Sequence, residues 1–135
     1  MTDNLFPDQT ALPEIEHTTV RVIALSGYGD IGRNMTIIET KDDMIIIDVG
    51  VMFSDPLHPG VDLIISDYTY VAERVAKLRG VFFTHGHEDH IGGAPFFLGE
   101  IAQMLEETVP FYGLPLTRSL LSEKIKEHGL SDYVD

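Results

Sequence analysis

The sequence predicts an α/β fold, and three observations point to that class. Short segments rich in Val, Ile and Thr, which are typical of strands, alternate with longer segments whose apolar residues recur at helical spacing. The length of 135 residues is sufficient for about one domain with its own core. A hydrophobic fraction of 44% beside 23% charged residues is typical of an ordered globular chain.

The first part of the chain is expected to contain an arm, three strands and a long loop. Residues 1–17 are acidic and lack periodicity, so we predict a flexible arm followed by one domain over residues 18–135. Prolines and glycines within residues 49–67 predict a long loop, and such loops are often functional. The predicted strands span residues 19–25, 34–40 and 44–48, with a tight turn at 41–43.

In the second part, helices and strands are expected to alternate. Val71, Val75 and Leu78 recur at helical spacing, which predicts a helix over residues 68–78 that stops at Gly80. The other expected helices cover the later part of residues 92–107 and residues 115–129, and the other expected strands cover residues 81–84 and 109–113.

The composition excludes several classes of protein. No apolar run approaches the roughly 20 residues that span a bilayer, and the acidic start is unlike a secretory signal, so we expect a cytoplasmic protein with no membrane partner. The chain has no cysteine, so any metal must be held by nitrogen and oxygen. The net charge of −13 argues against a broad basic surface for nucleic acid, although metal ions can neutralise carboxylates beside phosphates.

The segment THGHEDHIGG, residues 84–93, concentrates three of the six histidines of the chain beside an aspartate. Imidazole nitrogens and carboxylate oxygens are ligands of Zn²⁺. His85 and His87 can converge on one ion, while Asp89 and His90 can serve a second ion about 3.5–4 Å away. The alternative, isolated surface histidines beside helix-capping acids, requires the three histidines to gather by accident.

The spacing H-x-H-x-D-H at residues 85–90 resembles the signature of the metallo-β-lactamase superfamily. The flanking segments GYGDIGRNMTIIE (27–39), IIIDVGVMF (45–53) and KIKEHGL (124–130) resemble the amino-terminal region of the ribonuclease J family, in the β-CASP branch. The resemblance covers about residues 20–130. It implies the amino-terminal part of an αββα sandwich, incomplete in this chain, that belongs to a metal-dependent RNase.

The resemblance also implies roles for the clustered residues. His85 and His87 would ligate one divalent ion, and Asp89 and His90 the other; zinc suits these ligands and manganese is a competitor. Water activated by the two ions would attack the RNA phosphodiester, with Asp89 orienting or deprotonating it. Asp48, at the end of its strand, would support the metal loop by hydrogen bonds. The family combines 5′-to-3′ exonuclease and endonuclease activity in RNA maturation and decay.

Gly27, Gly29 and Gly32 satisfy the dinucleotide-binding pattern G-x-G-x-x-G, but a strand-like segment follows where that site needs a helix. In the resembled family this loop lies beside the active site, so the three glycines are expected to allow close backbone packing there. The remaining histidines have no partner at ligand spacing and are predicted to lie on the surface: His17, His58 and His128.

The chain ends before the further ligands that the resemblance implies: two histidines and an acid that bridges both ions. The β-CASP and carboxy-terminal domains of the family are absent too. We therefore expect that the isolated chain neither holds two ions tightly nor turns over RNA, and that one face of its sheet is apolar and uncovered. A second chain that supplies the missing ligands, and a homo-oligomer as in the family, are possible partners.

Two other functions stay open. A metallohydrolase for another substrate, such as a thioester or a lactone, would share the six-residue motif. A non-catalytic assembly module would need a partner to cover its sheet. The segments around Asn34 and His128 favour the ribonuclease over the generic hydrolase.

Overall fold

The centre of the molecule is a five-stranded sheet with helices on one of its faces. A computed structural model describes residues 12–29, 31–54 and 59–135. In chain order its elements are β1 (Arg21–Ser26), β2 (Met35–Glu39), β3 (Met44–Ile47), β4 (Met52–Phe53), β5 (Leu63–Ile64), α1 (Thr69–Ala72), the 3₁₀ turn η2 (Val75–Lys77), β6 (Leu78–Phe82), α2 (Glu88–Ile91), α3 (Ala94–Ile101), η3 (Ala102–Met104), β7 (Phe111–Tyr112), α4 (Pro115–Glu127) and η4 (Ser131–Tyr133).

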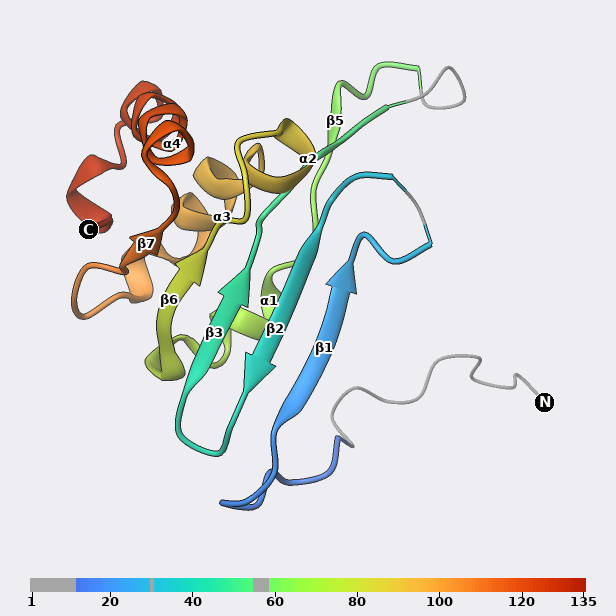
Figure 1. The fold of residues 1–135 in the computed structure, drawn as a ribbon, viewed down its shortest axis with the longest axis vertical. Coiled ribbons are helices and arrows are strands. Elements are labelled where there is room, and N and C mark those ends of the chain that lie inside the picture. Colours follow the sequence, from blue (N-terminus) through green and yellow to red (C-terminus); the bar gives the residue numbers. More distant parts are fainter. Residues whose placement is uncertain (1–11, 30, 55–58) are drawn as a thin grey trace.

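The strand order places two parallel strands side by side at the middle of the sheet. The order is β1-β2-β3-β6-β7 (Figure 1), with antiparallel pairing from β1 to β3 and parallel pairing from β3 to β7. Ile47, the last residue of β3, lies opposite Phe82, the last residue of β6. Because parallel strands end at the same edge of a sheet, the residues that follow β3 and β6 are neighbours in space.

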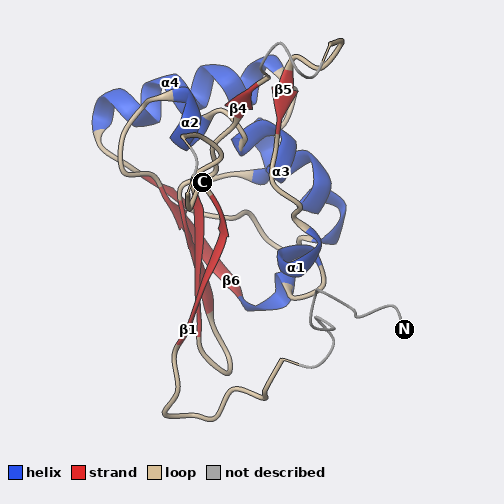
Figure 2. Cartoon of the chain, turned by 90° about the vertical axis from the view of Figure 1, so that its right-hand side faces the viewer, coloured by secondary structure: helices blue, strands red, loops and turns tan. Residues whose placement is uncertain are grey.

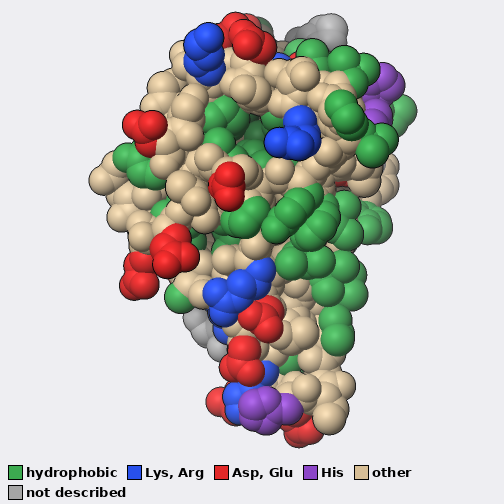
Figure 3. Space-filling view, turned by 60° about the vertical axis from the view of Figure 1, so that its left-hand side comes forward, with side chains coloured by type: hydrophobic (Ala, Val, Ile, Leu, Met, Phe, Trp, Pro, Cys, Tyr) green, Lys and Arg blue, Asp and Glu red, His purple; other side chains and the backbone are tan. Residues whose placement is uncertain are grey.

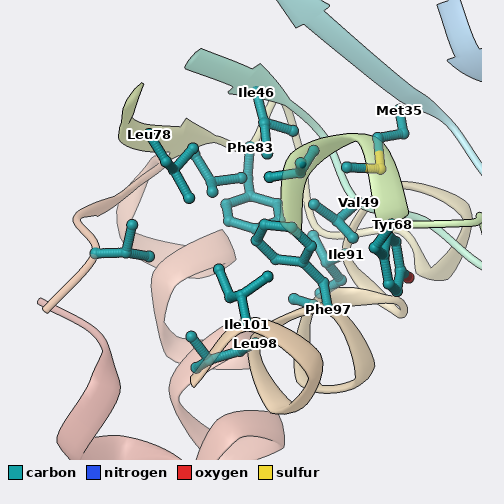
Figure 4. Packing of buried hydrophobic residues seen from close by; sticks show 14 of the residues in the cluster. Met35, Ile46, Val49, Tyr68, Leu78, Phe83, Ile91, Phe97, Leu98 and Ile101 are labelled. Carbon is teal, nitrogen blue, oxygen red and sulfur yellow. The ribbon is translucent and has the colours of Figure 1, made fainter. Parts of the chain in front are cut away.

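One face of the sheet and the helices enclose a hydrophobic core. Alternate residues of β2 and β3, among them Ile37 and Ile46, point inward and are fully buried. The ring of Phe97 in α3 packs edge-on against Tyr68, with ring centroids 5.3 Å apart (Figure 4). Ile91 of α2 is buried in the same cluster. This packing fixes α2 and α3, and therefore the loop between β6 and α2.

The other face of the sheet is apolar, and no described helix covers it. Figure 2, which views the sheet edge on, shows α1 and α3 on one side of the strands. On the other side Val22 is 65% exposed, Phe82 40% and Tyr112 47%. Figure 3 shows hydrophobic side chains gathered across the middle of the molecule and down its right-hand side. The expected uncovered apolar face is therefore observed, and it is what one half of a two-sheet sandwich presents.

Most of the predicted elements are confirmed near their predicted bounds. The three amino-terminal strands correspond to β1, β2 and β3, and the turn between the last two closes through a 2.8 Å bond from the Thr40 amide to the Asp43 carbonyl. The predicted helix at 115–129 is α4, which Gly129 ends with a positive φ of 68°.

The prediction of a helix over residues 68–78 is wrong beyond its first turn. Only Thr69–Ala72 is α-helical, and Leu78 begins β6, so Gly80 is a strand residue rather than a helix stop. A Cβ on Gly80 would lie 2.8 Å from the ring of Tyr112. Pairing with β3 and this close ring contact override the helical periodicity of the segment.

The predicted loop at 49–67 also contains more structure than expected. Within it β4 and β5 form a two-stranded antiparallel sheet, in which Met52 lies opposite Ile64. The short helix α2 was not predicted, because it lies inside the segment interpreted as the metal loop.

Some predictions fall outside the described residues. These include His58 and residues 1–11 of the expected arm at 1–17, so the arm and the domain boundary at residue 18 stay predictions. Among the described residues, none of the helices has both the length and the apolar character that crossing a bilayer requires.

Candidate metal centre

The loop that follows β6 is held against the end of β3 by backbone hydrogen bonds. The amide of Val49 donates to the carbonyl of His90 at 2.8 Å, and the amide of Val51 to the carbonyl of Glu88 at 3.1 Å. Between them, a Cβ on Gly50 would lie 1.7 Å from the Asp89 carbonyl oxygen, so only glycine fits there. The loop and the strand end therefore form one rigid unit.

The short helix α2 turns the chain so that Asp89 and His90 point back toward the preceding histidines. It starts after His87, whose carbonyl accepts the amides of His90 and Ile91, both at 2.9 Å. From the other side Lys124 of α4 pairs with Glu88 at 2.7 Å. The loop is thus fixed by the core, by the end of β3 and by α4.

The four predicted ligands come together as two pairs. His85 Nε2 lies 3.2 Å from His87 Nδ1, and His90 Nε2 lies 3.3 Å from Asp89 Oδ2. Two donors at about 2.0–2.1 Å from one zinc ion, at a tetrahedral angle, lie about 3.3 Å from each other. The rings of His85 and His90 are close, with centroids 4.1 Å apart. The spacing within each pair therefore fits a shared divalent ion, and the two pairs are adjacent.

Each pair is only part of a coordination shell. Within residues 12–29, 31–54 and 59–135 no group of three His, Asp or Glu side chains is arranged around one metal position. Zinc usually takes four ligands, so each ion would need about two more from water or from other groups.

Asp48 lies directly behind the pair formed by Asp89 and His90. Its carboxylate accepts hydrogen bonds from the Thr84 amide and from the Thr84 hydroxyl, both at 2.8 Å. Its second oxygen also lies 2.8 Å from His90 Nδ1. Asp48 is 5% exposed and has a positive φ of 61°, which is unusual for a residue other than glycine. A proton on Nδ1 of His90 would be held here, which leaves Nε2 free for an ion.

Two residues at this site were not predicted from the sequence. Thr84 precedes the histidines and bonds Asp48. Asn34, which follows the glycine-rich loop, places its side-chain nitrogen 3.0 Å from the Asp89 carbonyl and 3.2 Å from Asp89 Oδ2. Asn34 is 55 residues from Asp89, so no local spacing could reveal the contact; its place directly before a predicted strand was the available signal.

The glycine-rich loop is followed by strand β2, as predicted, and not by the helix that a dinucleotide-binding site needs. Gly27, Gly29 and Gly32 all have positive φ. A Cβ on Gly27 would lie 2.8 Å from Cα of Asn34, which brings this glycine next to the candidate site, whereas Gly32 approaches Met52 and Gly29 has open space around it.

A hollow of about 730 Å³ lies elsewhere, under α4 (Figure 3). Its lining includes the apolar side chains of Phe111, Leu121 and Ile125 and the charged side chains of Arg118 and Asp135. None of the four predicted ligands lines it, so the metal loop and this hollow are separate features.

The opposite end of the sheet contains a closed ionic network around Glu39, which is 1% exposed. Its carboxylate accepts from Lys77 at 2.8 Å and from the hydroxyl of Tyr70, while Arg21 lies at 3.5 Å. Burial by itself would raise the pKa of Glu39, but the hydrogen bonds from Lys77 and Tyr70 and the nearby positive charges lower it below its usual value. Burial and the bond to Glu39 raise the pKa of Tyr70.

Comparison with known proteins gives matches over most of the chain. A model described as the metallo-beta-lactamase superfamily matches residues 28–102. Ribonuclease J2 of Bacillus subtilis is 40% identical over 116 residues, which are 86% of this chain and 20% of that protein. Ribonuclease J of Thermus thermophilus is 44% identical over 111 residues, or 82% of this chain and 19% of that protein. The chain therefore spans about a fifth of the length of these relatives.

A solved structure gives the same architecture at low sequence identity. The short form of human tRNase Z superposes with a TM-score of 0.54 and 15% identity, over 85% of this chain and 42% of that one. The matches confirm the resemblance inferred from the loop and its flanking segments, and the α/β class with an incomplete metallo-β-lactamase architecture.

Proposed function

Because the chain belongs to the metallo-β-lactamase superfamily, we propose that it is the amino-terminal part of a ribonuclease J-like enzyme that hydrolyses RNA phosphodiester bonds. Relatives named ribonuclease J are 40–44% identical to it over more than four fifths of its length. Catalysis is supported most directly by two adjacent pairs of possible metal ligands, His85 with His87 and Asp89 with His90. Both pairs lie at the edge of the sheet where β3 and β6 end.

The superfamily uses divalent metal ions, and the donors present here suit them. In the proposed centre His85 and His87 hold one ion, and Asp89 and His90 hold the other. Zinc fits the nitrogen-rich set best, and manganese is the alternative. Such ions would act as Lewis acids, which make water more acidic and stabilise negative charge on phosphate oxygens.

The residues around the proposed ions have different roles in this proposal. Asp89 orients the attacking water and accepts its proton. Asp48 holds Nδ1 of His90, so that Nε2 faces the ion, and Thr84 fixes the Asp48 carboxylate. Gly50 provides the close approach that keeps Asp89 against the strand end.

The charge of the chain supports chemistry that depends on ions. Its net charge is −13, and several of its cations already pair with acids. Lys77 and Arg21 pair with Glu39, and Lys124 pairs with Glu88. Attraction to RNA phosphates at this site would therefore come from bound ions and from the rest of the protein. Homo-oligomerisation, a partner chain and a cytoplasmic location stay predictions.

The test compares the complete reading frame that contains this chain with residues 1–135 alone. We expect the complete protein to hydrolyse labelled RNA when zinc or manganese is present, and the 135-residue chain to be nearly inactive because its coordination shells are incomplete. His87→Ala in the complete protein should lower the rate of RNA hydrolysis by more than about a hundredfold. The substitution removes a proposed metal ligand and not merely a group that orients a ligand.

The matched control is His128→Ala, which removes a histidine whose ring bonds the Lys124 carbonyl at the end of α4. It should keep the wild-type rate. RNA hydrolysis that is unaffected by His87→Ala would contradict the proposal, and so would metal-dependent hydrolysis of a thioester or lactone without any hydrolysis of RNA.

A further inference from the structure

We propose that Asn34 is a positioning residue for the pair formed by Asp89 and His90. Its side-chain amide fixes the Asp89 carboxylate and lies against the nitrogen through which His90 would hold an ion. The inference rests on the metal binding proposed above and adds to it a residue from a distant part of the sequence.

The contacts define how the amide is oriented. Nδ2 of Asn34 lies 3.0 Å from the Asp89 carbonyl oxygen, 3.2 Å from Asp89 Oδ2 and 3.3 Å from His90 Nε2. A carbonyl and an ionised carboxylate can only accept hydrogen bonds, so the nitrogen of the amide, and not its oxygen, must face Asp89. The amide is thus a donor directed at the acid of the pair.

The position of Asn34 is itself firmly held. Its backbone amide donates to the same Asp89 carbonyl at 3.0 Å, and its carbonyl accepts the Gly50 amide at 3.0 Å. On the other side it abuts Gly27, where a Cβ would lie 2.8 Å from both Cα and Oδ1 of Asn34. The side chain therefore has little room to move, so it restricts Asp89 rather than adapting to it.

The chemistry of a carboxamide suits this place. The side-chain nitrogen of Asn34 has two hydrogens, and the two oxygens of Asp89 can use both. The lone pair of His90 Nε2 then stays available for an ion. Because the amide is neutral, it holds Asp89 in place without cancelling the negative charge that attracts the ion. A lysine would pair with Asp89 and compete with the ion.

The test measures zinc binding at each histidine rather than catalysis. The complete protein that contains this chain and its Asn34→Leu variant, in which the side chain has nearly the same size but no donor, are titrated with Zn²⁺ while the imidazole nitrogens are followed by ¹⁵N NMR. The apparent affinity reported by His90 should fall about 10–100-fold, as is typical when a group that supports a ligand is lost. The affinity reported by His85 should change less than about threefold.

The control is Gln103→Leu, which removes a carboxamide that bonds only Tyr133, at 3.4 Å, among the described residues. It should bind zinc as the wild type does. Asn34→Ala, which keeps the backbone hydrogen bonds, is measured as a second variant, and circular dichroism reports whether each variant is folded.

Equal zinc affinity at His90 in the wild type and in both Asn34 variants would overturn the inference, as would an equal loss at His85 and His90. Either result leaves the proposed function standing if His87→Ala still abolishes the response of His85. A wild-type protein whose histidines do not respond to zinc at all would instead refute the proposed metal centre, and the inference with it.

Discussion

The two ends of the sheet each bury a carboxylate, but the groups around these carboxylates differ. At one end Glu39 is surrounded by Lys77, Arg21 and Tyr70, so its charge is balanced within the protein. At the other end the hydrogen bonds that Asp48 accepts from the described residues come from the uncharged groups of Thr84 and from His90. Beyond it two pairs of donors face each other with no cation among the contacts described for them.

This difference separates a structural network from a functional one. The Glu39 network is complete, because each of its members has a partner of opposite charge or a hydrogen bond. The loop at the other end orders nitrogen and oxygen donors at metal-ligand spacing, and none of the contacts described for these donors comes from a lysine or an arginine. This arrangement is what the proposed metal centre requires, because a bound cation would balance and complete it.

The largest expected effect comes from Gly50→Ala at the loop end. A Cβ placed 1.7 Å from the Asp89 carbonyl must displace backbone, so we expect the free energy of unfolding to fall by at least about 3 kcal/mol. Denaturant unfolding of the chain measures this. The matched control is Gly99→Ala in α3, where the nearest atom is 3.7 Å away and stability should rise by up to about 1 kcal/mol. Wild-type stability of Gly50→Ala would mean that the loop is not fixed to β3.

A smaller effect is expected from Asp48→Asn. An amide nitrogen facing His90 would favour a proton on Nε2 of that histidine, which blocks the nitrogen that faces the ion. Zinc affinity at His90 should fall about 10–100-fold, and ¹⁵N NMR should show the changed tautomer. Asp43→Asn, whose partner is Arg79 on the exposed surface, serves as control and should leave zinc binding unchanged. An unaltered tautomer would show that Asp48 does not set the orientation of the ring.

The smallest effect is expected from Glu39→Gln, which should cost about 1–2 kcal/mol of stability at pH 7 and leave zinc binding intact. The folded state lowers the pKa of Glu39 from 4.5, so its contribution is fully present above pH 4.5 and is lost as the pH falls through the lowered value. Unfolding measured from pH 7 downward should show the wild type and the variant converging below pH 4.5. A difference that persists or grows in acid would contradict this account of the network.

The elements and the candidate ligands were predictable because local patterns determine them. The β-branched residues in 34–40 and 44–48 predicted β2 and β3, and the spacing of His85, His87, Asp89 and His90 predicted a cluster. The failures come from non-local contacts. The segment that contains Leu78 and Gly80 has helical periodicity, but pairing with β3 and the ring of Tyr112 make it a strand.

The same limit applies to the surroundings of the site. Asn34 and Thr84 contact Asp89 and Asp48 across 55 and 36 residues, and such distances leave no periodicity to detect. The Glu39 network was also missed, because Arg21, Tyr70 and Lys77 become neighbours of Glu39 only when β1, β2, α1 and η2 pack together. A single sequence identifies residue types suited to a reaction better than the contacts that orient them.

The backbone bonds that join Asp89 to Asn34, and His90 to Val49, have a consequence for protein engineering. The decapeptide 84–93 is not a portable module, because its carbonyl groups depend on amides from two other stretches of chain. Grafting it onto another scaffold would require the segments around residues 33–34 and 48–51 to be transplanted with it, in the same mutual arrangement. A designer who copied the histidine motif alone would obtain the same residues in a loop that lacks the hydrogen bonds holding it in place.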